Sequence, residues 1–454
     1  MEATAKKATF QKYPAYKESG VEWLGELPKN WDEVPLCTLT KLKSVINCSE
    51  LELLSVYLDL GVIKFSEVEA KRTNVTSQDL SKYQRVDIGD FVLNNQQAWR
   101  GSVGVSNHQG IVSPAYLVLE LSKKLHTGYA NYMFRSGYMV GQYLINSKGV
   151  GTIQRNLYWP SLRRAKVILP PLPEQTAIAA FLDDKTAKID RAIAQKEKMI
   201  ALLKERKQII IQNAVTKGLD PNAKMKHSGV EWIGEIPEGW EVKRLKFLGN
   251  IYSGISGKSG EDFSKENNGS MKPFVPFTNI CNNLKIDVDQ YQYVRISESE
   301  NQNRVKKCDL LFLMSSETLE DIAKNSIYLG DDQELYLNSF CKGFRLHSDR
   351  ALPEYVNYLL YSKPYRDYFS LVGRGFTRIN LKQEYINDVY TILPPIEEQT
   401  AIVAHIETQS AKIDKAIKLQ EQQIEKLKEL KSTLIDSAVT GKLRVPSVQE
   451  IKVS

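Results

Sequence analysis

Two stretches of the chain, residues 168–219 and 392–443, have the hydrophobic spacing of long amphipathic helices. Each opens on prolines, which suit a helix entry, and then continues for about 40 residues until Gly218 or Gly441. A heptad seam predicts two helices, each roughly 60 Å long, that pack as a coiled coil. The seam positions are Leu182, Ile189, Leu203, Ile210, Ile193, Ile200 and Ala214 in the first stretch, and Ile406, Ile413, Leu427, Leu434, Ile417, Ile424 and Ala438 in the second.

Both seams are interrupted by lysine at the same position, Lys207 in the first and Lys431 in the second. One interpretation is that the aliphatic stems carry these charges out to solvent. The other is that polar residues control the register of an antiparallel helix pair. If the two helices meet at their midpoints, Lys207 faces Glu407 and Lys431 faces Asp183.

The sequence of the first half of the chain recurs in the second half. The two helical stretches align without a gap, starting ILPPLPEQTAIAAFL and ILPPIEEQTAIVAHI. Upstream, KESGVEWLGELPKNWDEVPL matches KHSGVEWIGEIPEGWEVKRL, and GVGTIQRNL matches GRGFTRINL. We expect the repeated tryptophans to dock each half against its neighbour; they are Trp23 and Trp31, and Trp232 and Trp240. A repeat of this kind predicts a pseudo-twofold molecule.

The sequence between the repeated segments differs between the two halves. Each half therefore contains a different domain, which we call a head. Short apolar runs such as 90–93, 116–119 and 310–313 predict strands, and 129–144 and 353–368 predict helical stretches. The predicted class is α+β, with two mixed α/β heads separated by two long helices in an antiparallel coiled coil. The predicted boundaries are 1–167 and 220–391 for the heads, 168–219 for the first helix, and 392–454 for the second helix and tail.

Composition narrows the class of protein. The chain has 454 residues, of which 42% are hydrophobic and 25% charged, as in a soluble protein of several domains. It has neither an apolar run long enough for a bilayer nor a signal-peptide core, so we expect a cytoplasmic protein. Five scattered cysteines and five scattered histidines favour neither disulfides nor a metal site. A net charge of +7 is compatible with a polyanionic partner.

Two kinds of segment could contact DNA. One is the amide-rich NNQQAWRG, since asparagine and glutamine can bond adenine and arginine can bond guanine; in the second head SSET holds the corresponding place. The other is the glycine-rich segment of each head, where the backbone can approach a phosphate. The candidates are Asn94, Asn95, Gln96, Gln97, Arg100, Gln154, Arg155, Ser315, Ser316, Arg374, Thr377 and Arg378.

Each candidate also has an ordinary structural interpretation. Trp99 is favoured as a core residue over one that stacks on a base. Asn94 and Asn95 could form a turn, and isolated arginines are usually solvated.

Taken together, SGVEWLGELP, the GDFVLNNQQAWRGSVGVS stretch, the GxG…NL segments and the repeated PPxxEQ helix entries resemble specificity subunits of type I restriction–modification enzymes. The resemblance covers nearly the whole chain. It implies that the heads are target-recognition domains, each recognising one half of a split DNA site. It also implies that the helices set the gap and dock two methyltransferase subunits.

The resemblance further implies that this chain is not an enzyme and holds no cofactor. S-adenosylmethionine, ATP and magnesium would belong to the methyltransferase subunits and to the restriction subunits that join the complex. The second head departs from the sequence pattern of the family. It has FLMSSETLED and LNSFCKGF where the first head has NNQQAWRGSVG and VSPAY.

Other classes of protein fit the sequence less well. A self-contained methyltransferase needs an Asn-Pro-Pro-aromatic loop, and an ATPase needs a GxxxxGK loop; neither occurs here. A scaffold that binds only proteins would explain the helices but not the arginine-rich and amide-rich segments. A stand-alone repressor would bind DNA without a methyltransferase.

Overall fold

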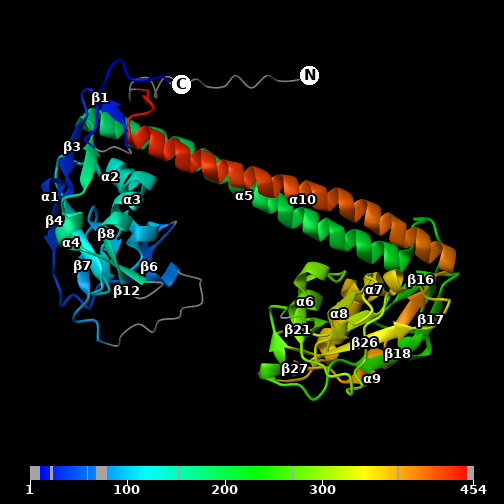
Figure 1. The fold of residues 1–454 in the computed structure, drawn as a ribbon. Coiled ribbons are helices and arrows are strands. Elements are labelled where there is room, and N and C mark those ends of the chain that lie inside the picture. The colour runs from blue at the N-terminus through cyan, green and yellow to red at the C-terminus, as the bar shows by residue number, and fades with distance from the viewer. Residues whose placement is uncertain are drawn as a thin grey trace. The chain divides into compact units, whose positions relative to one another are not determined.

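The computed structural model describes residues 11–20, 24–58, 60–67, 79–150, 154–267, 269–375 and 378–446. It divides into two compact units, one of residues 1–196 with 421–454 and one of residues 197–420. Each unit contains one head with part of helix α5 (Leu172–Lys217) and part of helix α10 (Ile396–Val439) (Figure 1). The predicted class of two mixed heads and two long paired helices is confirmed. In these ranges no helix is long and apolar enough to cross a membrane.

The facing parts of α5 and α10 are antiparallel within each unit. In the first unit the Lys431 Nζ lies 2.7 Å from a carboxylate oxygen of Asp190, and in the second the Lys207 Nζ lies 2.8 Å from Asp414. Ile189 and Ile413 are buried in the seam, as the heptad spacing predicts. The two lysines therefore cross the seam to the opposite helix instead of only reaching into solvent.

The expected partners of these lysines, Glu407 and Asp183, are wrong by one heptad, because each lies seven residues before the observed partner. Glu407 forms an ion pair with Lys285 of the second head instead, at 2.6 Å. The midpoint assumption fails because the first turns of each helix are built into the core of a head. Ile178 of α5 and Ile402 of α10 belong to the two head cores and are fully buried.

The first head is built on an antiparallel four-stranded sheet in the order β4-β11-β8-β9. The helical stretch expected at 129–144 is two helices, since Ser136 is extended and its hydroxyl accepts from the Met139 N–H to cap the second. The strands are β1 (Tyr16–Glu18), β2 (Glu26–Pro28), β3 (Asp32–Pro35), β4 (Thr40–Lys43), β5 (Leu54–Tyr57), β6 (Gly61–Lys64), β7 (Gln84–Val86), β8 (Phe91–Asn94), β9 (Val103–Val105), β10 (Gly110–Val112), β11 (Tyr116–Leu121), β12 (Ser147–Val150), β13 (Gln154–Leu157) and β14 (Lys166–Leu169). The helices are α1 (Leu36–Leu39), α2 (Thr127–Arg135), α3 (Gly137–Ile145) and α4 (Trp159–Leu162), with 3₁₀ turns η1 (Phe65–Glu67) and η2 (Ala98–Arg100).

The second head repeats this plan with the sheet β18-β26-β22-β24 and adds a second sheet, β19-β21-β20-β25. Its strands are β15 (Met225–His227), β16 (Glu235–Pro237), β17 (Glu241–Arg244), β18 (Gly249–Ser253), β19 (Phe263–Ser264), β20 (Lys272–Val275), β21 (Gln292–Val294), β22 (Leu310–Leu313), β23 (Ser315–Ser316), β24 (Asn325–Ile327), β25 (Tyr336–Leu337), β26 (Cys341–Leu346), β27 (Ile379–Asn380) and β28 (Tyr390–Leu393). Its helices are α6 (Phe277–Asn282), α7 (Pro353–Tyr361), α8 (Lys363–Val372) and α9 (Gln383–Asp388), with 3₁₀ turns η3 (Leu245–Phe247), η4 (Gly260–Asp262) and η5 (Val288–Gln290). The heads thus share a scaffold despite their divergent sequences.

The repeated tryptophans anchor the heads to the helix entries. The Trp31 indole N–H donates to the Glu174 carboxylate at 2.9 Å, and the Trp240 indole N–H donates to Glu398 at 3.1 Å. Both rings are buried, which confirms the docking role predicted for this pair; Trp23 lies outside the described residues. The glutamate of each PPxxEQ segment is therefore the acceptor for its own head's tryptophan.

The glutamine of each PPxxEQ segment is buried and bonds three backbone groups. Gln175 accepts from the His126 N–H and donates to the carbonyls of Lys124 and Pro170, at 2.8, 3.0 and 2.9 Å. Gln399 makes the equivalent set in the second unit. These bonds tie the loop before the head helices to the start of the long helix.

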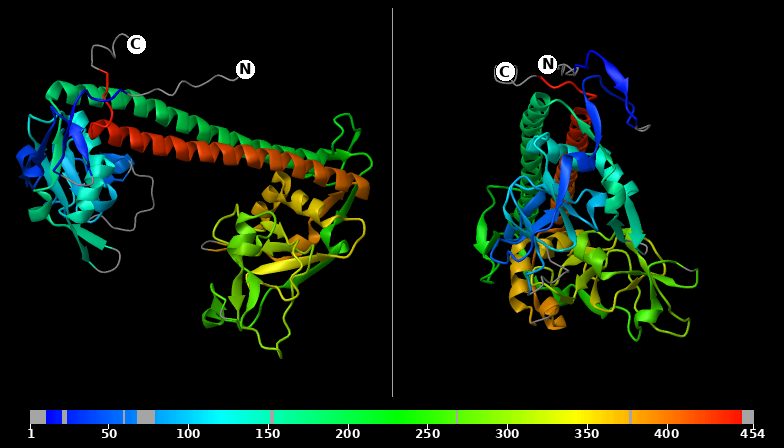
Figure 2. Two further views of the ribbon diagram at one scale, coloured as in Figure 1. Left: turned by 45° about the horizontal axis from the view of Figure 1, so that its top comes forward. Right: turned by 90° about the vertical axis from the view of Figure 1, so that its left-hand side faces the viewer.

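The end of α10 meets the N-terminal segment within the first unit (Figure 2). The Arg444 N–H donates to the Gln11 carbonyl at 2.9 Å, and the Tyr16 hydroxyl donates to the Gly441 carbonyl at 3.3 Å. Tyr129 also donates to the carbonyls of Ile168 in β14 and of Val439, the last residue of α10, so the first head contacts the end of α10.

Candidate nucleic-acid interface

A tight turn leads into the central strand of each head, and a buried aspartate closes it. Asp90 precedes β8 and accepts from the Asp87 N–H at 2.7 Å. Asp309 precedes β22 and accepts from the Lys306 N–H at 2.8 Å. The residue before each aspartate has a positive φ, 93° at Gly89 and 70° at Cys308. The sequences GDFV (residues 89–92) and CDLL (residues 308–311) share the aspartate and the apolar residues after it, and they occupy the same structural position in the two heads.

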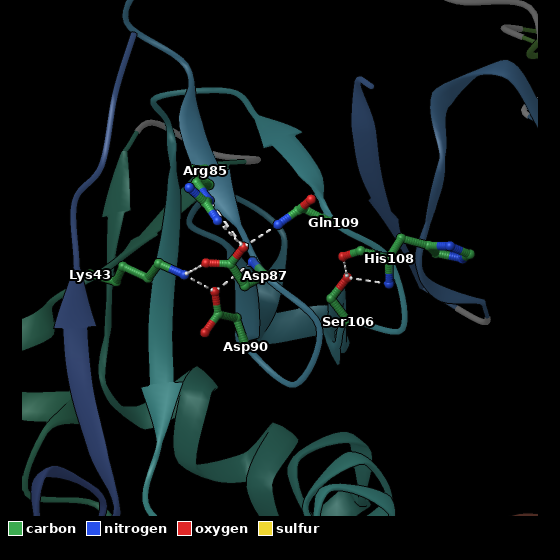
Figure 3. A network of polar contacts seen from close by, with 7 residues as sticks. All are labelled: Lys43, Arg85, Asp87, Asp90, Ser106, His108 and Gln109. Carbon is green, nitrogen blue, oxygen red and sulfur yellow. Dashed lines mark hydrogen bonds and ion pairs between the residues drawn. The ribbon is translucent and has the colours of Figure 1, made fainter. Parts of the chain in front are cut away.

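In the first head the turn carries a charged network (Figure 3). The Lys43 Nζ from β4 lies 2.6 Å from Asp87 and 2.5 Å from Asp90. The Lys43 ammonium, then the Gln109 amide, hold the pKa of Asp87 well below its usual range. Arg85 completes the network with an ion pair to Asp87 at 2.8 Å. This network fixes where β8 begins, and so where the segment after it emerges.

In the second head, other side chains form the polar network around the aspartate that precedes the central strand. Asp309 accepts from two nitrogens of Arg345, at 2.9 and 2.7 Å, and from the Tyr252 hydroxyl at 2.6 Å. Hydrogen bonding to Asp309 raises the pKa of Arg345, so the guanidinium stays charged. Both oxygens of the buried Asp309 carboxylate therefore have hydrogen-bond donors.

The amide-rich segment of the first head is the turn that follows β8. The Asn94 side chain accepts from the Gln96 N–H at 3.1 Å, which is the turn interpretation of this residue. Its amide nitrogen donates to the Tyr116 hydroxyl at 3.4 Å. The side chains of Asn95, Gln96 and Gln97 form no hydrogen bond to another described residue. Three amides are thus available on this turn.

The glycine-rich hairpin lies against this turn. The Leu157 N–H of β13 donates to the Asn95 carbonyl at 3.1 Å. The Arg155 Cζ lies 6.0 Å from the centroid of the Trp99 ring, and the Arg100 Cζ lies 4.6 Å from it. The core position favoured for Trp99 is wrong, because the ring is only half-buried. The structure describes no side chain for Gln154.

A further cation lies on the same hairpin. The Lys148 Nζ of β12 lies 3.9 Å from the centroid of the Tyr158 ring, which is 43% exposed. Neither residue was a candidate from the sequence. Lysine and tyrosine on facing ends of a hairpin leave no clear signal in the sequence.

In the second head, Ser315 and Ser316 follow the central strand, as predicted from the first head, but both are buried. Ser315 and Ser316 form β23 and pair with β27, opposite Asn380 and Ile379. Their exposed fractions are 6% and 4%, which argues against direct contact with DNA. The Leu381 N–H donates to the Met314 carbonyl at 2.9 Å, matching the bond from Leu157 to Asn95.

The arginines of the second glycine-rich segment have different environments. Arg374 donates to the carbonyls of Leu371 and Gly373, at 2.6 and 2.9 Å, and so caps the end of α8. The Arg378 Cζ lies 4.8 Å from the centroid of the Phe340 ring, which is 50% exposed. Thr377 lies outside the described residues.

The sequence analysis missed a second amide-rich segment, residues 300–304, with the sequence ENQNR. Together with Tyr252, Lys306, Tyr336 and Arg345 it lines a pocket of about 360 Å³. The side-chain amides of Gln302 and Asn303 donate to the backbone carbonyls of Ser256 and Ser253, respectively. The Lys258 ammonium lowers the pKa of Glu300 to about 2. A search for segments with the amide-rich composition of residues 94–100 would have identified this segment. The amides of Gln302 and Asn303, however, form hydrogen bonds within the head.

Among the described residues, the end of the central strand, which we call the edge of each head, therefore presents guanidinium groups without a carboxylate partner: Arg100 and Arg155 in the first head and Arg378 in the second. In the described ranges the ion pairs of arginine involve Arg85, Arg244, Arg304, Arg345 and Arg350. Arg100 and Arg155 in the first head and Arg378 in the second instead lie over aromatic rings. Uncompensated guanidinium groups beside free amides are suited to phosphates and base edges.

Comparison with known proteins gives a consistent result. The model of the type I restriction modification DNA specificity domain matches residues 28–200 and again residues 237–429. The type I restriction enzyme EcoKI specificity subunit of Escherichia coli (strain K12) is 24% identical over 92% of this chain and 90% of its own length. The family match covers both heads and most of both long helices.

Two solved structures are similar in fold. One, from work on complex assembly and conformational transition of the type I R-M system, aligns with a TM-score of 0.68 at 18% identity, over 92% of this chain and 99% of that one. The other is the HsdS subunit from Thermoanaerobacter tengcongensis, with a TM-score of 0.50 at 17% identity, over 92% and 98%.

Proposed function

The chain belongs to the family of type I restriction–modification DNA specificity subunits, and we propose that each of its heads recognises one half of a bipartite DNA target. One observation carries the proposal: the two heads have the same strand order but different side chains at the equivalent edge. A shared scaffold with different edge residues is suited to two different half-sites. The chain itself performs no catalysis in this proposal.

The free donors at the edges support contact with DNA in the first head. Asn95, Gln96, Gln97, Arg100 and Arg155 lie together on two segments joined by a backbone hydrogen bond. Amides and guanidinium groups are the side chains that bond adenine and guanine edges. In the second head, Arg378 takes this role, and the buried Ser315 and Ser316 support the backbone behind it.

The long helices would set the gap between half-sites and dock two methyltransferase subunits. Ion pairs across the seam and the buried glutamines that tie each head to a helix entry support a fixed geometry in each unit. Several apolar side chains lie outside the seam and are half exposed, which supports a protein partner on the helices. They are Met199, Leu202, Ile209, Leu419 and Leu430.

S-adenosylmethionine would be bound by those methyltransferase subunits, and ATP and magnesium by restriction subunits. The sequence supports this division, since neither a methyltransferase catalytic loop nor a phosphate-binding loop is present.

The test is a genome-wide map of adenine methylation in cells with and without this gene, with the methyltransferase partner present in both. Loss of one bipartite, gapped motif on deletion is expected. If every motif persists, the protein-binding scaffold becomes the better interpretation. Salt-dependent DNA binding by the assembled complex separates the two independently, because a protein-only scaffold has no phosphate contacts.

A further inference from the structure

Each head holds an arginine over a partly exposed aromatic ring at the equivalent edge of its sheet. Arg100 lies 4.6 Å from the Trp99 ring centroid, and Arg378 lies 4.8 Å from that of Phe340. The rings come from different places, since Trp99 lies in η2 after β8 and Phe340 lies in the turn before β26. The two heads have therefore reached one arrangement with unrelated residues.

Backbone bonds put both arrangements at the same structural position. In the first head, Asn95 follows β8 and accepts from Leu157. In the second, Met314 follows β22, accepts from Leu381, and donates its own N–H to the Phe340 carbonyl at 3.1 Å. Each ring thus stands beside the residue where the central strand ends and the glycine-rich segment attaches.

An aromatic ring lies next to the guanidinium of each of these arginines. Within the described ranges none of Arg100, Arg155 and Arg378 has a carboxylate partner. A guanidinium over a ring interacts through its face, which leaves the five N–H donors in its plane available. A fork held in this way matches the O6 and N7 acceptors of guanine in the major groove.

We propose that Trp99 and Phe340 are specificity-determining positioning residues, one for each half-site. Trp99 orients Arg100, with Arg155 beside it, and Phe340 orients Arg378, each toward a guanine edge of its own half-site. This rests on the proposed function, because it assumes that the heads contact DNA. Each half-site then contains a G·C pair whose recognition depends on the ring as well as on the arginine.

The expected loss of base discrimination differs between removal of the ring and removal of the arginine. An exposed cation–π contact corresponds to about 2- to 5-fold in an equilibrium constant, and a bidentate contact to guanine to about 5- to 150-fold in discrimination. Removing the ring should therefore weaken discrimination at one base pair about 2- to 5-fold. Removing the fork should weaken it at that same base pair by the larger factor.

The experiment uses the full chain assembled with its methyltransferase partner on a randomised DNA library, with methylated adenines mapped by sequencing. Trp99→Leu is expected to relax one G·C position in one half-site and to leave the other half-site unchanged. Phe340→Leu should do the same in the opposite half-site. Trp99→Phe, which keeps a ring, should retain most of the preference.

Further variants keep the test decisive. Arg100→Lys leaves Trp99 in place, keeps the charge and loses the fork, so it should relax the same position even if Trp99→Leu folds poorly. The matched control is Phe247→Leu. Phe247 is 65% exposed, and the Lys246 Nζ lies 5.6 Å from the centroid of its ring. Phe247 lies near the C-terminal end of β26, whereas Phe340 lies just before the N-terminal end of that strand. This control variant should change no base preference.

Two results would overturn the proposal. One is an equal loss at all positions with a weaker salt dependence, which would identify phosphate contacts. The other is an unchanged base preference in both ring variants. Failure of the proposed function is distinct from either, since the unmodified complex would then methylate no bipartite motif.

Discussion

Replacing Gln399 by methionine tests how the second head is attached to its long helix. The Gln399 side chain is fully buried. It accepts from the Leu352 N–H and donates to the carbonyls of Arg350 and Pro394, each at 2.8 Å. Methionine has a similar volume and no hydrogen-bonding group of this kind, so the change removes three bonds without a large cavity.

The expected loss of stability is about 3 kcal/mol. A net contribution of about 1 kcal/mol per hydrogen bond gives this value, and backbone groups left unpaired in the interior would increase it. The loop 350–352 would detach from the helix entry first, because its two bonds to Gln399 disappear together. At about 1.4 kcal/mol for each factor of ten, amides that exchange through this opening should exchange about 100-fold faster.

The assay is hydrogen exchange followed by mass spectrometry on the peptide that contains α7, with α2 of the first head as internal reference. Gln175→Met is the twin variant and should affect α2 but not α7, because Gln175 makes the same three bonds in the first unit. Thr400→Ala is the control, since its exposed hydroxyl bonds only the Ile396 carbonyl of its own helix. A change below about 1 kcal/mol, or equal acceleration in both heads, would refute the reasoning.

Three other predictions follow from particular contacts. Exchanging the charges of Lys207 and Asp414 together should recover stability lost by either single change, with a coupling of about 0.2–1 kcal/mol because both groups are partly exposed; additive effects in a urea-unfolding double-mutant cycle would contradict it. Cys308→Gly should raise the free energy of unfolding by up to about 1 kcal/mol, since φ there is 70°, and a loss of stability at the urea midpoint would exclude this. The lowered pKa of Asp87 stabilises the folded state above the unfolded pKa of about 4, and this contribution is lost as the pH falls below it. Lys43→Met should therefore reduce the acid sensitivity of the first head, measured by circular dichroism between about pH 5 and pH 2, and an unchanged curve would argue against the network.

Local patterns in the sequence predicted the elements correctly. The heptads of residues 168–219 and 392–443 indicated two long paired helices. The apolar runs at 90–93 and 310–313 correspond to strands β8 (Phe91–Asn94) and β22 (Leu310–Leu313). Gly89-Asp90 and Cys308-Asp309 form equivalent turns, because a positive φ followed by an aspartate that closes the turn is a property of a few adjacent residues.

The register of the helices could not be read in the same way. In a seam that repeats every seven residues, a shift of one heptad keeps apolar residues facing one another over most of its length, so the heptad pattern does not distinguish Glu407 from Asp414 as the partner of Lys207. Packing of the first helical turns on the heads removes that freedom. The choice depended on residues distant in the chain.

The sequence by itself determined the repeat, the secondary structure, the family resemblance and the segments in which DNA contacts were expected, because these depend on neighbouring residues. Only the tertiary structure decided which side chains at those segments are free. It buried Ser315 and Ser316 in a strand pair, left Trp99 half-buried beside two arginines, and put Phe340 under Arg378. Exposure and pairing depend on which distant segments meet, and no local pattern of charge or hydrophobicity specifies that.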